Sequence, residues 1–271
     1  MDSHFAPAAR VLLHLQPDDL PVLRATRDGL AGWARRIDEA DAHGVGELVL
    51  RDPLMALRTL AQVAHALPAH HADSVQTVKA ALLLTGIEPF FRRCAGLCVV
   101  QEQLAGRPAA LAGALAALER AHASARVAAA FAVHRQDHEV ELLHQAALLH
   151  DFPDLLLWCA APAAALELQA LGQSDPGLRA IDAQQAVLGT TFDLVATALL
   201  ERWRLPAALC EAGRWWMADS PGARCVRLAV RLVRHLQQGV SHPAMQDDLH
   251  DAGRLLNLSP TAVFALVRKM L

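Results

Sequence analysis

The feature that most constrains the fold is an abundance of Ala and Leu beside very few aromatic residues. Hydrophobic residues make up 54% of the sequence, yet aromatic residues make up only 4% and Tyr is absent. Alanine loses no side-chain entropy in a helix and leucine loses little, whereas aromatic and β-branched residues fit a pleated sheet. Residues 110–134 are almost continuous Ala and Leu. We therefore expect an all-α fold.

Helix start and stop signals divide the chain. Asp52 followed by Pro53 predicts a helix N-terminus, because Asp caps a free N–H and proline lacks the N–H that would be free there. Ser259 and Pro260 form the same signal. A further start is expected at Asp73 or Ser74, with Gly86 as the helix end. Other segments predicted to be helical are residues 89–103, 138–157, 182–203 and 221–238.

The 271 residues are enough for one large domain or for two lobes. Gly106 and Pro108 interrupt the helical pattern. We therefore place a boundary there, between an N-terminal helical lobe, residues 1–105, and a second helical lobe, residues 106–271.

Charge and hydropathy argue against several classes of partner. The formal net charge of −3 gives no basic surface for nucleic acid or an anionic membrane. No uninterrupted apolar stretch reaches the roughly 18–20 residues of a membrane span, and residues 1–19 lack the pattern of a secretory signal.

The cysteines form no close CxxC pair and are expected to be free thiols: Cys94, Cys98, Cys159, Cys210 and Cys225. We expect a cytoplasmic protein.

The residues that could carry chemistry are a histidine and an adjacent aspartate. His150 and Asp151 follow the apolar run of residues 146–149, and they could give a nitrogen and an oxygen to one divalent cation. A third donor would have to come from another helix, and His122 is the candidate. The alternative is that all three are core polar groups that bond to one another or to the backbone.

Several motifs occur in an order typical of one known family. These are residues 50–54 with Leu57 and Leu60 ("DP-x-L-…-L"), residues 75–86 ("sv-x-x-Ai-x-x-LG"), residues 122–124, residues 147–151 ("GLLHD") and residues 189–206 ("G-…-vGa-x-Ll-x-x-W-x-LP"). From about Leu20 to its C-terminus the chain resembles the HDOD domain family, a branch of the HD superfamily of metal-dependent phosphohydrolases. The resemblance implies a two-lobed, HD-domain-like helical architecture. It also implies a bacterial signal-transduction module that acts through protein contacts, with a signalling partner of unknown identity.

Departures from the family pattern bear on catalysis. Trp215 and Trp216 stand where the family often has a histidine pair, Thr191 stands where a histidine is frequent, and residues 226–230 contain no aspartate. At most His122, His150 and Asp151 would remain as ligands, too few for a hydrolytic centre. We therefore expect a degenerate site and no enzyme activity. No cofactor is expected, and a single divalent metal is left open.

Two alternative functions stay open at this point. The first is a residual HD-type metal-dependent phosphohydrolase in which the same three residues hold one ion. The second is a nucleotide-binding sensor without turnover, with its ligand in a cleft between the lobes.

Two clusters of basic residues have interpretations of their own. Arg224, Arg227, Arg231 and Arg234 are three or four apart, so they share one helix face, interpreted as a solvated stripe or as a site for an acidic partner or a nucleotide phosphate. A second cluster lies near a helix end around Pro68 and is interpreted as solvated: His65, His70 and His71.

Overall fold

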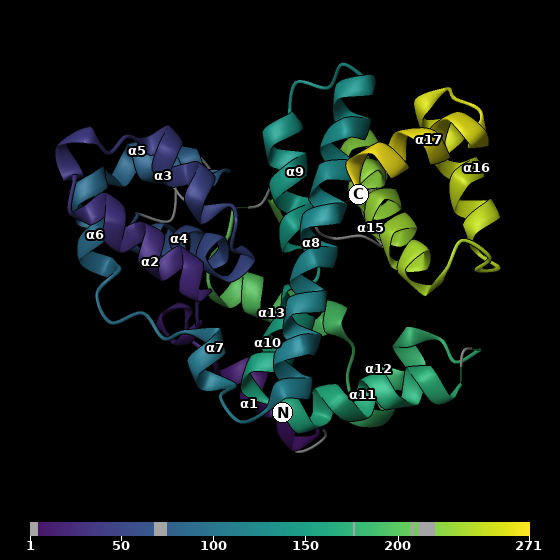
Figure 1. Ribbon diagram of the computed structural model, residues 1–271, viewed down its shortest axis with the longest axis horizontal. Helices are drawn as coiled ribbons and strands as arrows, with labels where there is room; N and C mark the ends of the chain where they lie inside the picture. Colours follow the sequence, from purple (N-terminus) through teal and green to yellow (C-terminus); the bar gives the residue numbers. More distant parts are fainter. Residues whose placement is uncertain (1–4, 68–74, 176, 207–208, 211–219) are drawn as a thin grey trace. The chain divides into compact units, whose positions relative to one another are not determined.

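The computed structural model describes residues 5–67, 75–175, 177–206, 209–210 and 220–271 (Figure 1). This part of the chain is all-α and contains no strand, as predicted. It forms two compact units, each discontinuous in sequence: Met1–Leu118 with Phe152–Pro206, and Glu119–Asp151 with Ala207–Leu271. The predicted lobes were defined as consecutive stretches of sequence, and their boundary at residue 105 stays a prediction.

The first unit begins with a group of short helices. Their bounds are α1 (Pro7–His14), η2 (Pro17–Asp19), α2 (Arg24–Ala34), η3 (Ile37–Glu39), α3 (Ala42–Val49), α4 (Pro53–Ala66), α5 (Val78–Thr85), α6 (Ile87–Arg93) and α7 (Val100–Gln103). Helix α4 is their core, because nearly every residue from Pro53 to Ala64 is buried.

Asp52 caps α4 as the sequence predicts. Its Oδ1 accepts hydrogen bonds from the N–H groups of Leu54 (3.1 Å) and Met55 (3.2 Å), and its Oδ2 accepts one from Leu23 (2.6 Å). Burial raises the pKa of this carboxyl, and the backbone hydrogen bonds oppose that rise. One side chain therefore both starts α4 and attaches the residue before α2.

Two predicted helices of this region were wrong in extent. Residues 89–103 form α6 and α7 rather than one helix, because Gly96 has a φ of +74° and Val99 forms an isolated parallel bridge with Val22. Helix α5 begins at Val78 with Thr77 as its N-cap, later than the predicted start at Asp73 or Ser74, which lie outside the described residues. Its predicted end is confirmed, since Gly86 is the C-cap with a φ of +79°.

The remainder of the first unit is formed by α10 (Phe152–Ala160), α11 (Pro162–Ser174), α12 (Ala180–Leu188) and α13 (Phe192–Arg202). Trp203, which follows α13, is fully buried. Its indole donates a hydrogen bond to the carbonyl of Leu15 (3.3 Å) and lies 6.2 Å from the ring of Phe152, centroid to centroid. Residues 182–203 were predicted as one helix, but Gly189, with a φ of +66°, divides them into α12 and α13.

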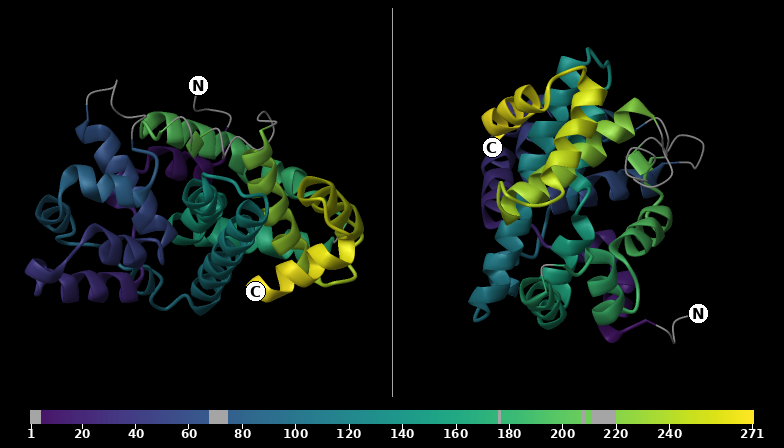
Figure 2. Two further views of the ribbon diagram at one scale, coloured as in Figure 1. Left: turned by 90° about the horizontal axis from the view of Figure 1, so that it is seen from above. Right: turned by 90° about the vertical axis from the view of Figure 1, so that its right-hand side faces the viewer.

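The second unit contains the rest of the described helices. The 27-residue helix α8 (Pro108–His134) contributes its residues from Glu119 onward, with α9 (Val140–Leu149), α15 (Pro221–Gln238), α16 (Met245–Leu256) and α17 (Pro260–Met270). Figure 2 shows α16 and α17 side by side at the yellow end of the chain. Ser259 caps α17, which confirms the predicted start. Gly222 lets α15 approach α9, since a Cβ there would lie 3.0 Å from the Leu143 side chain.

No single described helix is long and apolar enough to cross a membrane. One consecutive pair of helical segments, Val140–Ala160 and Pro162–Ser174, has the length and composition of a membrane span only when the two are taken together. The pair is bent by 119° at the break.

Candidate functional site

His150 and Asp151 lie at a helix break that the sequence itself produces. Residues 138–157 were predicted as one helix, but α9 ends at Leu149 and α10 begins at Phe152. Pro153 lacks the N–H that a continuous helix would pair with a carbonyl one turn earlier, so it belongs in a first turn. The break turns both side chains into the second unit, where they are 9% and 6% exposed. The imidazole Nδ1 of His150 lies 2.5 Å from Oδ1 of Asp151.

Two arginines hold the carboxylate of Asp151. Arg234 on α15 approaches in a bidentate manner, with Nη2 2.5 Å from Oδ1 and Nε 3.3 Å from Oδ2. Arg120 on α8 places its Nε 3.5 Å from Oδ2. A guanidinium fork matches the two oxygens of a carboxylate, and hydrogen bonds between charged partners are stronger than neutral ones. Both carboxylate oxygens are thus engaged by cationic groups.

These neighbours keep Asp151 ionised. Burial by itself raises the pKa of the Asp151 carboxyl, but the charges of Arg234, His150 and Arg120 outweigh it and hold the pKa well below its ordinary value. The carboxylate therefore serves as a permanent counter-ion that joins α8, α9 and α15 within one unit.

The described donors do not fit a divalent metal. A metal ion would need the same Asp151 oxygens that Arg234 occupies, and a guanidinium beside the site repels a cation. Among the described residues, no three His, Cys, Asp or Glu side chains come together where they could hold one ion. The structure thus brings His150 and Asp151 together without gathering His122 into a three-ligand site. Their assignment as vestigial metal ligands stays a prediction.

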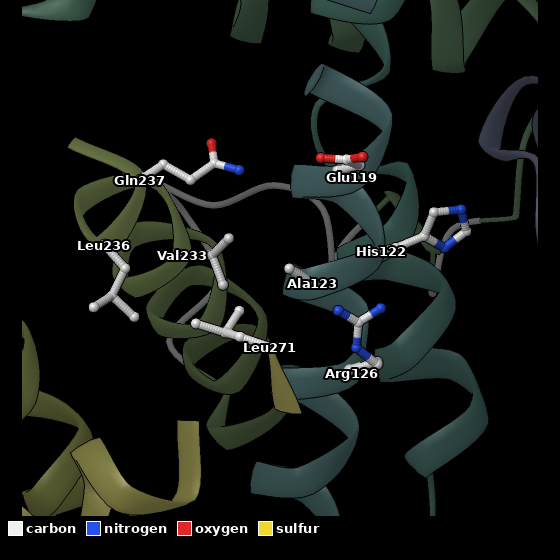
Figure 3. A pocket seen from close by; sticks show the side chains of 8 residues that line it. All are labelled: Glu119, His122, Ala123, Arg126, Val233, Leu236, Gln237 and Leu271. Atoms are coloured by element: carbon white, nitrogen blue, oxygen red, sulfur yellow. The ribbon is translucent and has the colours of Figure 1, made fainter. Parts of the chain in front are cut away.

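His122 lies on α8 in the part that belongs to the second unit. It lines a pocket of about 470 Å³ together with Glu119 and Arg126 of α8, three residues of α15, and Leu271. In Figure 3 its imidazole points away from the α15 side chains, whereas Ala123 faces Val233.

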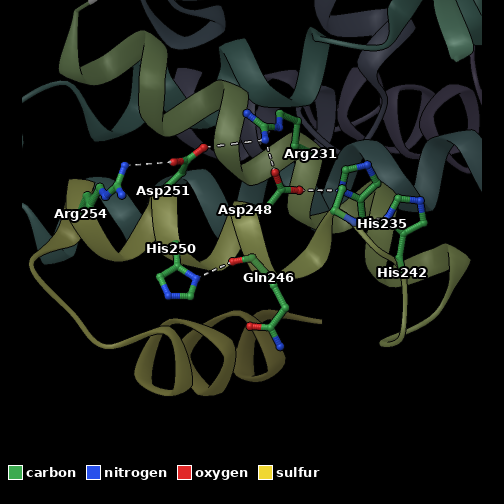
Figure 4. A network of polar contacts seen from close by, with 9 residues as sticks. Arg231, His235, His242, Gln246, Asp248, His250, Asp251 and Arg254 are labelled. Carbon is green, nitrogen blue, oxygen red and sulfur yellow. Dashed lines mark hydrogen bonds and ion pairs between the residues drawn. The ribbon is translucent and has the colours of Figure 1, made fainter.

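Sequence reasoning missed another buried carboxylate in the second unit, that of Asp248. Asp248 on α16 is fully buried, forms an ion pair with Arg231, and lies 2.5 Å from Nδ1 of His235 (Figure 4). The ring of His235 stacks on that of His242, with centroids 4.2 Å apart. Arg231 and Arg234 therefore both bind buried carboxylates, although their side chains are 38% and 42% exposed, so the interpretation of the arginine stripe as a solvated face holds only in part. Nothing in the pattern of α15 says which helix supplies their partners.

Other residues singled out in the sequence have structural roles or lie outside the described residues. Thr191 caps α13, with its hydroxyl accepting from the N–H of Leu194 (3.3 Å). His65 bonds through Nδ1 to the carbonyl of Ala61 (2.8 Å), in the last turn of α4. Outside the described residues lie His70, His71, Trp215 and Trp216.

The described part of the chain is all-α and has a histidine–aspartate doublet at a helix break, as the resemblance to the HD superfamily implies. The model of the HDOD domain matches residues 35–217, which is more than half of the chain. The chain belongs to the HDOD family, and the resemblance inferred from its motifs is confirmed.

Solved structures share the fold at low identity. The MmoQ response regulator from Methylococcus capsulatus is 18% identical with a TM-score of 0.68, over 94% of this chain and 99% of that one. A virulence factor from Campylobacter jejuni is 15% identical with a TM-score of 0.64, over 97% and 100%. An HDOD domain protein with unknown function from Geobacter sulfurreducens is 16% identical with a TM-score of 0.50, over 97% and 93%. A search of the curated proteins finds none that matches the sequence.

Proposed function

We propose that this chain is a non-enzymatic signal-transduction module of a bacterium that acts in the cytoplasm through contacts with signalling proteins. The observation that carries the proposal is the environment of Asp151. The carboxylate that a hydrolytic centre would direct at a metal is bound by Arg234, Arg120 and His150 instead. Hydrolysis in such enzymes requires a metal-activated water, and this arrangement offers the metal no open carboxylate.

Membership of the HDOD family and the name of one relative support a regulatory role. The M. capsulatus protein that shares the fold is described as a response regulator. A scaffold whose buried charges are paired internally keeps its shape without an ion, and shape is what a protein partner recognises. The doublet then stabilises the helices that present a surface, and it takes no part in chemistry.

Enzyme assays with a matched variant test this proposal. The purified protein is incubated with a panel of phosphomonoesters, phosphodiesters and nucleotides in the presence of Mn²⁺, Fe²⁺ or Zn²⁺, in parallel with His150→Ala. We expect product formation by the two proteins to equal the rate without protein. Hydrolysis by the wild type that disappears in His150→Ala would contradict the proposal and establish the phosphohydrolase alternative.

Affinity capture from the native host tests the contact mechanism. We expect the same partner to be retained by the wild type and by His150→Ala, since the doublet lies inside the second unit. A chain that retains no protein partner under native conditions would count against action through protein contacts.

A further inference from the structure

A second cavity lies entirely in the first unit, which does not contain Asp151. Its volume is about 760 Å³, within the range of small-molecule sites. Three segments line it: residues 16–18 at the start of η2, residues 58–66 of α4, and residues 93–95 at the end of α6 and just after it. The lining residues are Gln16, Pro17, Asp18, Arg58, Gln62, His65, Ala66, Arg93 and Ala95.

Arg58 is the buried cation of this cavity. Its side chain is 7% exposed, and its Nη1 donates to the carbonyl of Asp18 (2.6 Å), with the carbonyls of Pro17 and Leu20 at 3.4 Å. Its Nε is buried and has no hydrogen-bond partner among the described residues. A buried donor without a partner costs free energy, so a group that accepts from it would be bound favourably.

The negative charge near Arg58 offsets the positive charge of its guanidinium group only weakly. Among the described residues that line the cavity, Asp18 alone carries a carboxylate, which is 76% exposed and lies 3.3 Å from Nη2 of Arg58. Its Oδ1 also accepts from the amide of Gln62 (2.6 Å). The neighbouring thiol of Cys94 adds no charge, because burial raises its pKa to about 12.

Arg93 supplies a second cation to the cavity. It lies in the last turn of α6 and makes no hydrogen bond or ion pair with any residue that the structure describes. His65 uses Nδ1 to bond Ala61, which leaves Nε2 as the remaining ring nitrogen. The described lining therefore has two guanidinium groups against one carboxylate, which gives this part of the cavity a net positive charge.

The geometry points to a binding site for a phosphorylated small molecule. Guanidinium groups match phosphate oxygens in a planar, bidentate manner, and two of them offset the charge of a phosphate monoester. The phosphate contacts Arg93 and the unpaired Nε–H of Arg58, while Gln62 and His65 provide polar surface for the rest of the ligand. This inference is independent of the proposed function, since the site lies in the unit that does not contain Asp151.

Calorimetric titration of the full chain tests the inference. The probes are inorganic phosphate, AMP and uncharged adenosine. The proteins are the wild type, Arg93→Gln and Arg92→Gln, which removes an exposed arginine from the same turn that does not line the cavity. We expect saturable binding of phosphate or AMP, no binding of adenosine, affinity about tenfold or more weaker in Arg93→Gln, and affinity within about twofold of wild type in Arg92→Gln.

Three results would overturn the inference. The first is no saturation by either phosphate probe up to about 10 mM. The second is adenosine binding as tight as that of AMP, since the site would then not recognise the phosphate. The third is equal weakening in both arginine variants, which would mean a diffuse effect of surface charge rather than a site. Failure here leaves the proposed function standing, because hydrolysis and partner capture are separate measurements.

Discussion

Replacing Asp151 with Asn removes the charge that Arg234, Arg120 and His150 surround. Leaving a buried charge unpaired costs about 3–5 kcal/mol. Arg234 is 42% exposed and Arg120 is 20% exposed, so both can turn toward water and recover part of that cost. We therefore expect the free energy of unfolding to fall by about 2 kcal/mol.

Urea unfolding followed by circular dichroism measures this loss. With a urea slope of about 2 kcal/mol/M, the midpoint should fall by about 1 M. The control is Asp182→Asn, which removes a carboxylate from a bidentate pair with Arg179 at the protein surface (2.7 and 2.9 Å). Surface pairs contribute little, so its midpoint should match the wild type. Equal midpoints for both variants would refute the claim that Asp151 anchors the second unit.

Three further predictions follow from the same structure. Because the pKa of Asp151 is lowered in the folded state, its contribution is present above the unfolded value of about 4 and is lost as the pH falls through the lower folded value, so the urea midpoints of wild type and Asp151→Asn should converge as the pH falls below about 4. The thiol of Cys159, whose pKa burial raises to about 12, should react with iodoacetamide far more slowly than exposed Cys98, as peptide mass spectrometry would show. Gly113→Ala, whose new Cβ would lie 2.5 Å from a buried indole ring, should lower stability by about 1–3 kcal/mol, whereas Gly172→Ala, with open space around it, should raise it by about 0.5–1 kcal/mol in thermal unfolding.

The fold class and several helix ends could be predicted because their causes are local. A capping side chain followed by proline sets a helix start within a few residues of sequence, and both Asp52 and Ser259 act as expected. Breaks inside apolar segments were missed at Gly96, Gly189 and Pro153. Apolar content alone does not distinguish one long helix from two short ones, since both bury the same residues.

The candidate site was predicted in part. The doublet of His150 and Asp151 is visible in the sequence because the two residues are adjacent and follow an apolar run. Its partners Arg120 and Arg234 are 31 and 83 residues away from Asp151. Their contact depends on how α8, α9 and α15 pack, which helical periodicity does not specify. The spacing of the arginines on α15 predicts that they share one helix face, but it does not predict which carboxylates they bind.

The content of bound metal tests the central claim most directly. The wild type and Asp151→Asn are dialysed against Mn²⁺, Fe²⁺ or Zn²⁺, passed over a desalting column and measured by elemental mass spectrometry. If Arg234 takes the place of an ion at Asp151, the two proteins retain the same substoichiometric amount of each metal. A full equivalent of metal in the wild type that is lost in Asp151→Asn would contradict that claim.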